Sequence, residues 1–275
     1  MQRTLILATI FGAACAGMAA ADAGGPSPGV TWGSPGVVDA KGAVRYVALD
    51  AGPGRTTVAS IGVHGGRVLG WRFLKGTFGV PQVAYDGSTS GLARNGRRLV
   101  LGSFATYGAP VTRFVILHPR TLRVRSRLTL NGAFAFDAIS PGGSLMYLLQ
   151  YLGDRNGGRY AVRVLNLNTH ELYAGSLVDR REPDEKMTGI AVTRTDSRDG
   201  AWAYTLYTRQ ARHPFVHALD TVHRRAFCVD LPWDSATSWA GGARMRIGAD
   251  GRTLEMLYRG RVRARMDTTS FEVSR

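Results

Sequence analysis

The segment SPGGSLMY, residues 140–147, places a glycine turn directly before an apolar strand, and this order recurs along the chain. The other turns are Asn95-Gly96, Asp199-Gly200 and Asp250-Gly251, each followed by an apolar run. The second glycines stand at positions 96, 143, 200 and 251, so their spacings are 47, 57 and 51 residues. Asn-Gly and Asp-Gly between apolar runs are strong hairpin signals, because a two-residue turn needs positive φ. The repeat predicts similar antiparallel units of about 50 residues.

Each predicted unit has four strands: one before the glycine turn and three after it. The strands before the turns are expected at 89–93, 134–139, 189–194 and 243–247, and the closing strands at 122–130, 172–178, 225–231 and 270–274. A four-stranded antiparallel meander of this size is typical of a β-propeller blade. Residues 43–73 are expected to form a fifth, degenerate unit, with its innermost strand within 31–38. We therefore expect an all-β fold, a β-propeller of about five four-stranded antiparallel blades. The alternative is a β-sandwich, which needs no such period.

Two repeat motifs resemble those of a known group of proteins. SPGGSLMY and VHALDT (residues 216–221) resemble the YVTN-type and WD40-like propeller repeats of exported bacterial proteins, which read roughly as SPDG, an aliphatic-Tyr strand and an aliphatic-Asp-Thr turn. The resemblance covers about residues 43–275. It departs from the pattern at Gly142, which replaces the Asp, and at His118, which replaces the Asp before its turn. The resemblance implies the blade fold and brings no catalytic residues.

The first residues have the layout of a secretory signal peptide. Met1-Gln2-Arg3 is a short cationic start, an apolar stretch follows, and Ala21-Asp22-Ala23 fits a small-x-small cleavage site. We therefore expect residues 1–23 to be a signal peptide, residues 24–42 a flexible Gly/Pro/Ser-rich lead, and residues 43–275 a single propeller domain. The expected location is secreted or extracytoplasmic. A lipid anchor on Cys15 is the alternative, although Gly12 stands where a lipobox has an aliphatic residue.

Composition excludes some broad classes. Of the 275 residues 44% are apolar and 20% charged, which excludes disorder for most of the chain. No apolar run of about 18 residues follows position 24, which argues against a multi-span membrane protein. The sequence has no nucleophile elbow and no phosphate-binding loop before a helix. His213 and His217 are about 13 Å apart on a strand and too distant to share an ion, so no metal or cofactor is expected.

Three functions remain open from the sequence. The first is a binding module without its own catalysis, for which Asp184 and Glu185 in a long acidic loop between two blades are candidate contacts. The second is an enzyme whose site is assembled at the channel mouth from several blades. Asp137 and Arg194 each lie six residues before the second glycine of their unit, and Arg246 lies near that position in the last unit.

The third function is attachment to an anionic polymer or lipid surface. The formal net charge is +15, and two strands carry arginine at every second position, which places each set on one strand face. These residues are Arg123, Arg125 and Arg127, and Arg259, Arg261, Arg263 and Arg265. The expected partner is a protein or envelope polymer whose identity the sequence does not give. Nucleic acid is not expected for an exported chain, and we expect a monomer.

Overall fold

The computed structural model describes residues 26–153, 158–183, 187–209, 212–233 and 242–275, and these contain no α-helix. Five sheets follow one another along the chain, and all their strand pairs are antiparallel. The first sheet contains β2 (Val37–Val38), β3 (Val44–Asp50), β4 (Arg55–Gly62) and β5 (Val68–Lys75). The second contains β7 (Leu99–Gly102), β8 (Val111–Leu117) and β9 (Val124–Asn131).

The remaining three sheets continue the same meander. The third contains β10 (Phe134–Ile139), β11 (Leu145–Leu152) and β12 (Arg159–Asn166). The fourth contains β13 (Ile190–Asp196), β14 (Trp202–Arg209), β15 (Arg212–Asp220) and β16 (Arg225–Asp230). The fifth contains β17 (Ala243–Ile247), β18 (Thr253–Tyr258), β19 (Arg261–Asp267) and β20 (Val273–Ser274). Strand order equals chain order in each of these five sheets, as the repeat predicts.

The repeated glycine occupies the same conformation in each sheet. Gly96, Gly143, Gly200 and Gly251 have φ between +65° and +74°. Each glycine N–H donates to the carbonyl three residues earlier, at 2.8–3.0 Å. The turn therefore spans four residues, not the two expected, and it still requires glycine because its last residue is left-handed. Gly42 repeats this turn in the first sheet, with φ +69° and a bond to the carbonyl of Asp39.

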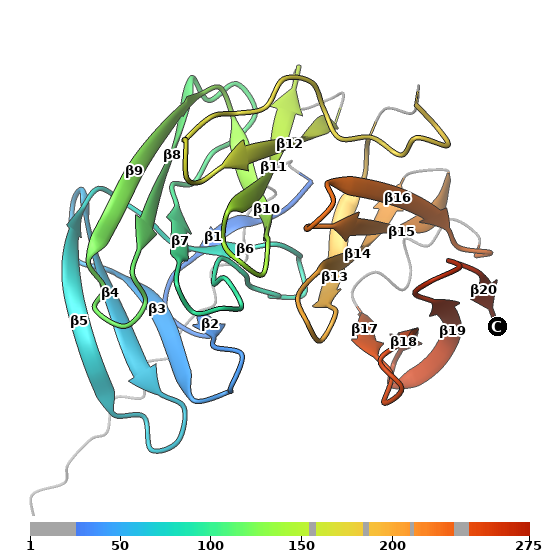
Figure 1. The fold of residues 1–275 in the computed structure, drawn as a ribbon, viewed down its shortest axis with the longest axis horizontal. Coiled ribbons are helices and arrows are strands. Elements are labelled where there is room, and N and C mark those ends of the chain that lie inside the picture. The colour runs from blue at the N-terminus through green and yellow to red at the C-terminus, as the bar shows by residue number, and fades with distance from the viewer. Residues whose placement is uncertain (1–25, 154–157, 184–186, 210–211, 234–241) are drawn as a thin grey trace, which may run out of the picture.

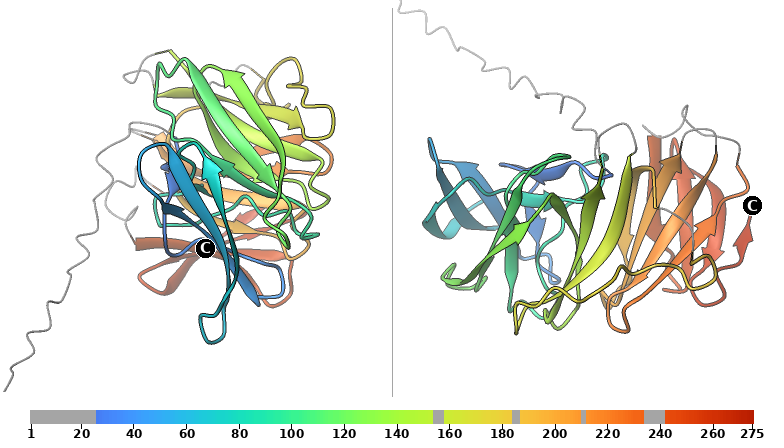
Figure 2. Two further views of the ribbon diagram at one scale, coloured as in Figure 1. Left: turned by 90° about the vertical axis from the view of Figure 1, so that its left-hand side faces the viewer. Right: turned by 90° about the horizontal axis from the view of Figure 1, so that it is seen from above.

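Four hydrophobic clusters hold the sheets together, and each lies between two consecutive sheets. They join the first sheet to the second, the second to the third, the third to the fourth, and the fourth to the fifth. Figures 1 and 2 show the sheets following one another around a common centre in this order. A sandwich would enclose one core between two sheets. The stacked sheets and separate cores are instead those of a propeller-like arrangement.

The two outermost sheet faces differ in chemistry. On the first sheet, Trp71 and Phe73 lie on the face opposite the core residue Leu74 and are 60% and 61% exposed. On the fifth sheet, the outer face carries Arg246, Glu255 and Arg265, which are paired across neighbouring strands. A polar outer face is typical of a terminal repeat. Within the described residues, no hydrophobic cluster joins the fifth sheet to the first.

The expected flexible lead is instead part of the fold. Residues 26–29 are buried, and β1 (Gly29–Thr31) pairs with β6 (Val80–Gln82) near the centre of Figure 1. The Trp32 indole N–H donates to the carbonyl of Phe78 at 2.8 Å, and β2 pairs with β3. The described fold thus begins at residue 26, not at 43. The expected signal peptide at 1–23, with Cys15, lies outside the described residues.

Two expected strands are not continuous. Residues 89–93 make only the bridges Gln82↔Thr89 and Leu92↔Leu99. Residues 172–178 meet β12 only at two isolated bridges, Leu165↔Leu172 and Val162↔Leu177. Glycines interrupt both segments, because Gly91 has φ +106° and Gly175 has φ +74°, values that a regular strand does not contain. The second and third sheets therefore have three regular strands each, and the prediction of four is wrong for them.

Candidate functional site

A pocket of about 430 Å³ lies where the glycine turns of the first four sheets meet. Those turns contribute Ala40, Arg94, Pro141 and Gly200 to its lining. The strand β13 runs from the N-terminal segment at one end to the pocket at the other. Its second residue, Ala191, donates a hydrogen bond to the carbonyl of Pro26, whereas its last residue, Asp196, lines the pocket. The N-terminal segment therefore covers one end of β13, and the pocket lies at the other.

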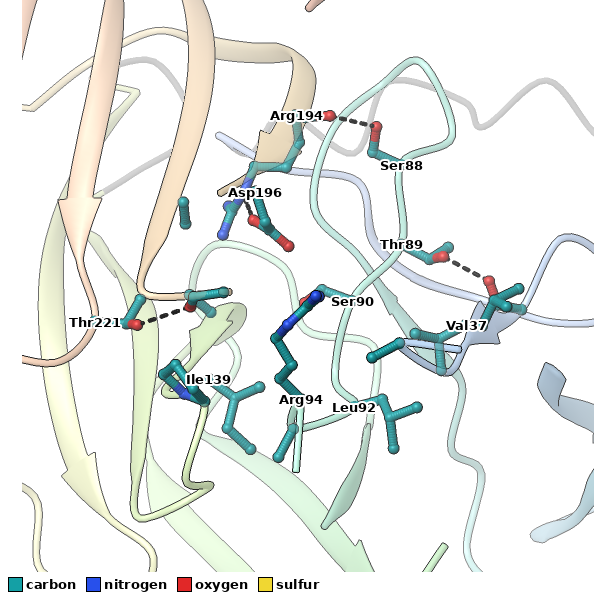
Figure 3. Close-up of a pocket in the computed structure, with 18 of the residues that line it drawn as sticks. Val37, Ser88, Thr89, Ser90, Leu92, Arg94, Ile139, Arg194, Asp196 and Thr221 are labelled. Atoms are coloured by element: carbon teal, nitrogen blue, oxygen red, sulfur yellow. Dashed lines mark hydrogen bonds and ion pairs between the residues drawn. The ribbon is translucent and has the colours of Figure 1, made fainter. Parts of the chain in front are cut away.

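Arg194 lines one wall of this pocket and forms a buried ion pair with Asp137 behind it. Arg194 on β13 donates from Nη1 to Asp137 Oδ1 on β10 at 2.8 Å, and the two side chains are 4% and 3% exposed. Arg194 also donates to Thr205 Oγ1 at 3.0 Å and from Nε to Asp196 Oδ1 at 3.1 Å (Figure 3). Burial lowers the pKa of Arg194, but the carboxylates of Asp137 and Asp196 outweigh it and raise that pKa. The guanidinium is thus charged and held by two carboxylates.

Asp137 reaches this position through an irregularity of its strand. The register between β10 and β11 shifts between Phe136 and Ala138, so Asp137 is the extra residue of a bulge. Bulges redirect a side chain out of the regular alternation. Asp137 Oδ2 is buried and has no hydrogen-bond partner within the described part of the chain. The ion pair therefore links the third and fourth sheets behind the pocket.

His217 on β15 lies near this pair and is 1% exposed. Burial lowers the pKa of His217, Asp137 opposes that effect, and Arg194 adds to it. The imidazole is therefore neutral at neutral pH. Burial also raises the pKa of neighbouring Tyr207, so this ring is uncharged as well. His217 and Tyr207 are thus neutral polar neighbours of the ion pair.

This burial predicts a pH dependence of stability. His217 takes up a proton more readily in the unfolded chain, whose histidine pKa is about 6.5, than in the folded protein. The unfolded state then binds more protons below that pH, so the contribution of His217 to stability is lost as the pH falls from 7 to 5. Denaturant titrations should show this loss in the wild type and a smaller loss in His217→Gln. His64→Gln, at an exposed position, is the control, and an equal loss in all three proteins would contradict the assignment.

Arg246, the third channel candidate, does not lie with Asp137 and Arg194. Its side chain is 62% exposed and pairs with Glu255 at 2.7 Å on the outer face of the fifth sheet. The residue six positions before Gly251 is Met245, whose side chain packs toward the fourth sheet. Arg246 follows it and points to the opposite face, because side chains alternate along a strand. Only two of the three residues named for a channel-mouth enzyme are together.

The other candidates occupy the outside of the molecule or fall beyond the described residues. Asp184 and Glu185 lie outside the described residues. The arginines of both stripes are exposed: Arg123, Arg125 and Arg127 on or beside β9, and Arg259, Arg261, Arg263 and Arg265 on or beside β19. Arg127 donates to the carbonyl of Lys75 and lies over the Phe78 ring. Arg265 pairs with Glu255 at 3.4 Å and Arg259 lies over the Tyr258 ring, so both stripes have arginines engaged within the protein.

Three lining residues of the pocket are not evident from the sequence: Arg45, Ser90 and Arg94. Arg94 follows the first residue of the repeated turn, a position held by Pro141 in the third sheet and Arg198 in the fourth. Aligning the turns could have placed Arg94 at the pocket end of the molecule. Arg45 and Ser90 carry no such signal, because only the packing of the first two sheets brings them there.

Metal and membrane features are absent from the part of the chain that the structure describes. No group of three or more His, Cys, Asp or Glu side chains could hold a metal ion there. No helix within the same residues is long and apolar enough to cross a bilayer.

Comparisons with known proteins find similar folds only. No family model and no curated protein matches the sequence. Among solved structures, the β-propeller domain of Cps50 (Swd1) from Myceliophteria thermophila is similar, with 11% identity and a TM-score of 0.48, covering 84% of this chain and 62% of that one. TolB from Acinetobacter baumannii has 10% identity and a TM-score of 0.41, covering 86% and 52%. A functionally unknown protein from Desulfotomaculum acetoxidans has 14% identity and a TM-score of 0.48, covering 86% and 67%.

The chain spans less than two thirds of the length of the first two of these structures. The propeller-like description rests on the sheet order and the four inter-sheet cores of this chain.

Proposed function

We propose that the chain is an exported binding module, a β-propeller of about five blades similar to the YVTN-type and WD40-like repeat proteins, whose ligand occupies the pocket at the glycine turns. One observation carries the proposal: four consecutive sheets contribute side chains to a single concave site of about 430 Å³. Ligand sites in proteins are few and concave, and they lie where several elements converge.

The chemistry of the pocket favours binding over catalysis. Arg194 is already held by Asp137 and Asp196, so neither carboxylate is poised to move a proton to or from a ligand. No serine or cysteine nucleophile paired with a histidine lines the site among the described residues. Export is supported by the signal-peptide layout of residues 1–23, a short cationic start, an apolar stretch and a small-x-small site at 21–23.

Native mass spectrometry of protein recovered from the envelope fraction of its own cells tests this proposal. We expect a chain starting at residue 22–24 that carries an added ligand mass. Ser90→Trp, which fills the pocket, should lose that mass. Thr129→Trp, at an exposed position on β9, should keep it. An added mass that survives Ser90→Trp would place the ligand elsewhere, and a chain that still starts at Met1 would contradict export.

A second candidate function, attachment to an anionic surface, is favoured by the fifth sheet. The short β20 pairs only with Arg265 and Met266, so it does not cover the part of β19 that carries Arg261 and Arg263. Binding through exposed arginines weakens steeply with added salt, because free charges are screened. Retention on anionic vesicles that is insensitive to salt would exclude this function.

A further inference from the structure

We propose that the pocket binds its ligand through an oxyanion, a carboxylate or phosphate group, held by Arg45 and Arg94. This inference rests on the proposed function and specifies the ligand class. The pocket is lined by three arginines and by Asp196 as its single carboxylate within the described residues. Arg194 is paired with Asp196 and with Asp137 behind it, and these three groups together carry one negative charge. Arg45 and Arg94 therefore leave the site with one net positive charge.

Neither of those two arginines is satisfied inside the protein. Arg45 Nε is buried and has no hydrogen-bond partner among the residues that the structure describes. Arg94 is exposed and makes no side-chain hydrogen bond or ion pair with any described residue, although its charge interacts with that of Asp199. An unpaired buried donor of a charged group is costly, so such donors usually await a partner. Arg45 therefore has a buried donor that an anion would satisfy, and the exposed head group of Arg94 is accessible to the same anion.

Arg94 is also held in place for that role. Its Cδ lies 3.1 Å from the position that a Cβ on Gly200 would occupy, so the arginine stem packs directly against the turn of the fourth sheet. Figure 3 shows the side chain extending into the pocket from the segment that also carries Ser90. A side chain fixed by its stem loses little further freedom when its head group binds a ligand.

The other residues that line the pocket indicate the chemistry of the rest of the ligand. Val37, Leu92 and Ile139 are apolar and Ser90 offers a hydroxyl, so the site fits a small molecule with one anionic head and an apolar body. The planar fork of arginine matches both carboxylate and phosphate oxygens. Hexanoate, hexyl phosphate and 1-hexanol have unbranched apolar chains of similar length and differ in the head, which makes them suitable probes.

Calorimetric titration of the three probes, at about physiological ionic strength, tests the inference. We expect at least one anion to bind the wild type about tenfold or more tightly than 1-hexanol, and Arg94→Gln and Arg45→Gln each to remove about tenfold of that affinity. Arg94→Lys should retain part of it. Arg125→Gln, on the outside of β9, should bind like the wild type, and equal thermal midpoints verify that the variants fold.

The outcomes separate this inference from the proposed function. A stronger affinity for hexanoate identifies a carboxylic acid ligand, and a stronger affinity for hexyl phosphate identifies a phosphate ester. Equal affinity for 1-hexanol, or equal weakening by Arg125→Gln, overturns the oxyanion inference alone. The oxyanion inference is also overturned if none of the three probes binds while Ser90→Trp still removes the native ligand mass. If the native ligand mass is also retained in Ser90→Trp, the proposed function is contradicted together with the oxyanion inference.

Discussion

Replacing Asp137 with alanine is expected to lower the free energy of unfolding by about 3–5 kcal/mol. The change leaves the Arg194 guanidinium, whose side chain is 4% exposed, without its buried partner between the third and fourth sheets. Asp196 remains as a second partner, but its side chain is 52% exposed, and a pair with an exposed partner contributes little. Denaturant titration of the wild type and the variant measures the difference.

Two further variants make this prediction specific. Asp196→Ala removes the exposed partner and should cost less than about 1 kcal/mol. Asp137→Leu combined with Arg194→Met removes both charges and should be less destabilising than Asp137→Ala, because no buried charge is left unpaired. If Asp137→Ala and Asp196→Ala have equal effects, the buried pair does not hold the two sheets together as described.

Replacing Gly36 with alanine is expected to lower the free energy of unfolding by about 2–4 kcal/mol. Gly36 has φ +65°, and a Cβ there would collide with the carbonyl oxygen of Tyr46 and the Val47 side chain of β3. The variant would have to strain its backbone and move the first sheet as well. Thermal and denaturant unfolding measure the loss.

Gly54→Ala is the matched control for this prediction. Gly54 has nearly the same φ, +66°, but a Cβ there would meet nothing within 4 Å. It should therefore cost only the left-handed backbone penalty, about 1–2 kcal/mol. A Gly36→Ala protein as stable as the wild type would mean that residues around Gly36 form a flexible lead outside the fold.

The repeat was the part of the fold that sequence could predict best. The turn requires a left-handed backbone at Gly96, Gly143, Gly200 and Gly251, and glycine is the residue type that adopts it readily. This requirement can therefore be read from the sequence. The equivalent turn at 39–42 is not visible, because Lys41 precedes its glycine where the other turns have Asn, Asp or Gly. Sequence therefore predicts four meander units from their turns, whereas the first unit, whose turn has an atypical composition, is predicted from its strands alone.

Composition misled the interpretation of residues 24–42. Glycine, proline and serine are typical of flexible linkers. Here Gly29, Gly33 and Gly36 have φ between +65° and +88°, so they shape a fixed path along the first sheet and β6. The same composition occurs in flexible linkers and in fixed irregular segments. Only contacts with distant segments distinguish the two, such as the hydrogen bond that Thr89 Oγ1 donates to the carbonyl of Gly36.

The candidate site was partly predictable for the same reason as the fold. Asp137 and Arg194 occupy equivalent repeat positions, and equivalent positions on neighbouring sheets lie close together. Arg246 is one residue out of that register, which on a strand means the opposite face. Arg45 lies in the degenerate unit at 43–73 and Ser90 in the expected strand at 89–93, but the repeat does not indicate that they face the pocket. Only the assembled sheets bring them there.

A crystal structure of the protein purified from its own envelope fraction, with no ligand added, tests the central claim most directly. Our account predicts density for a retained molecule in the pocket between Arg94, Arg45 and Ser90, with an anionic group at the two guanidinium groups. A retained molecule seated instead on the arginines of β9 or β19, or on the exposed Trp71 and Phe73 face of the first sheet, with water in the pocket, would contradict it.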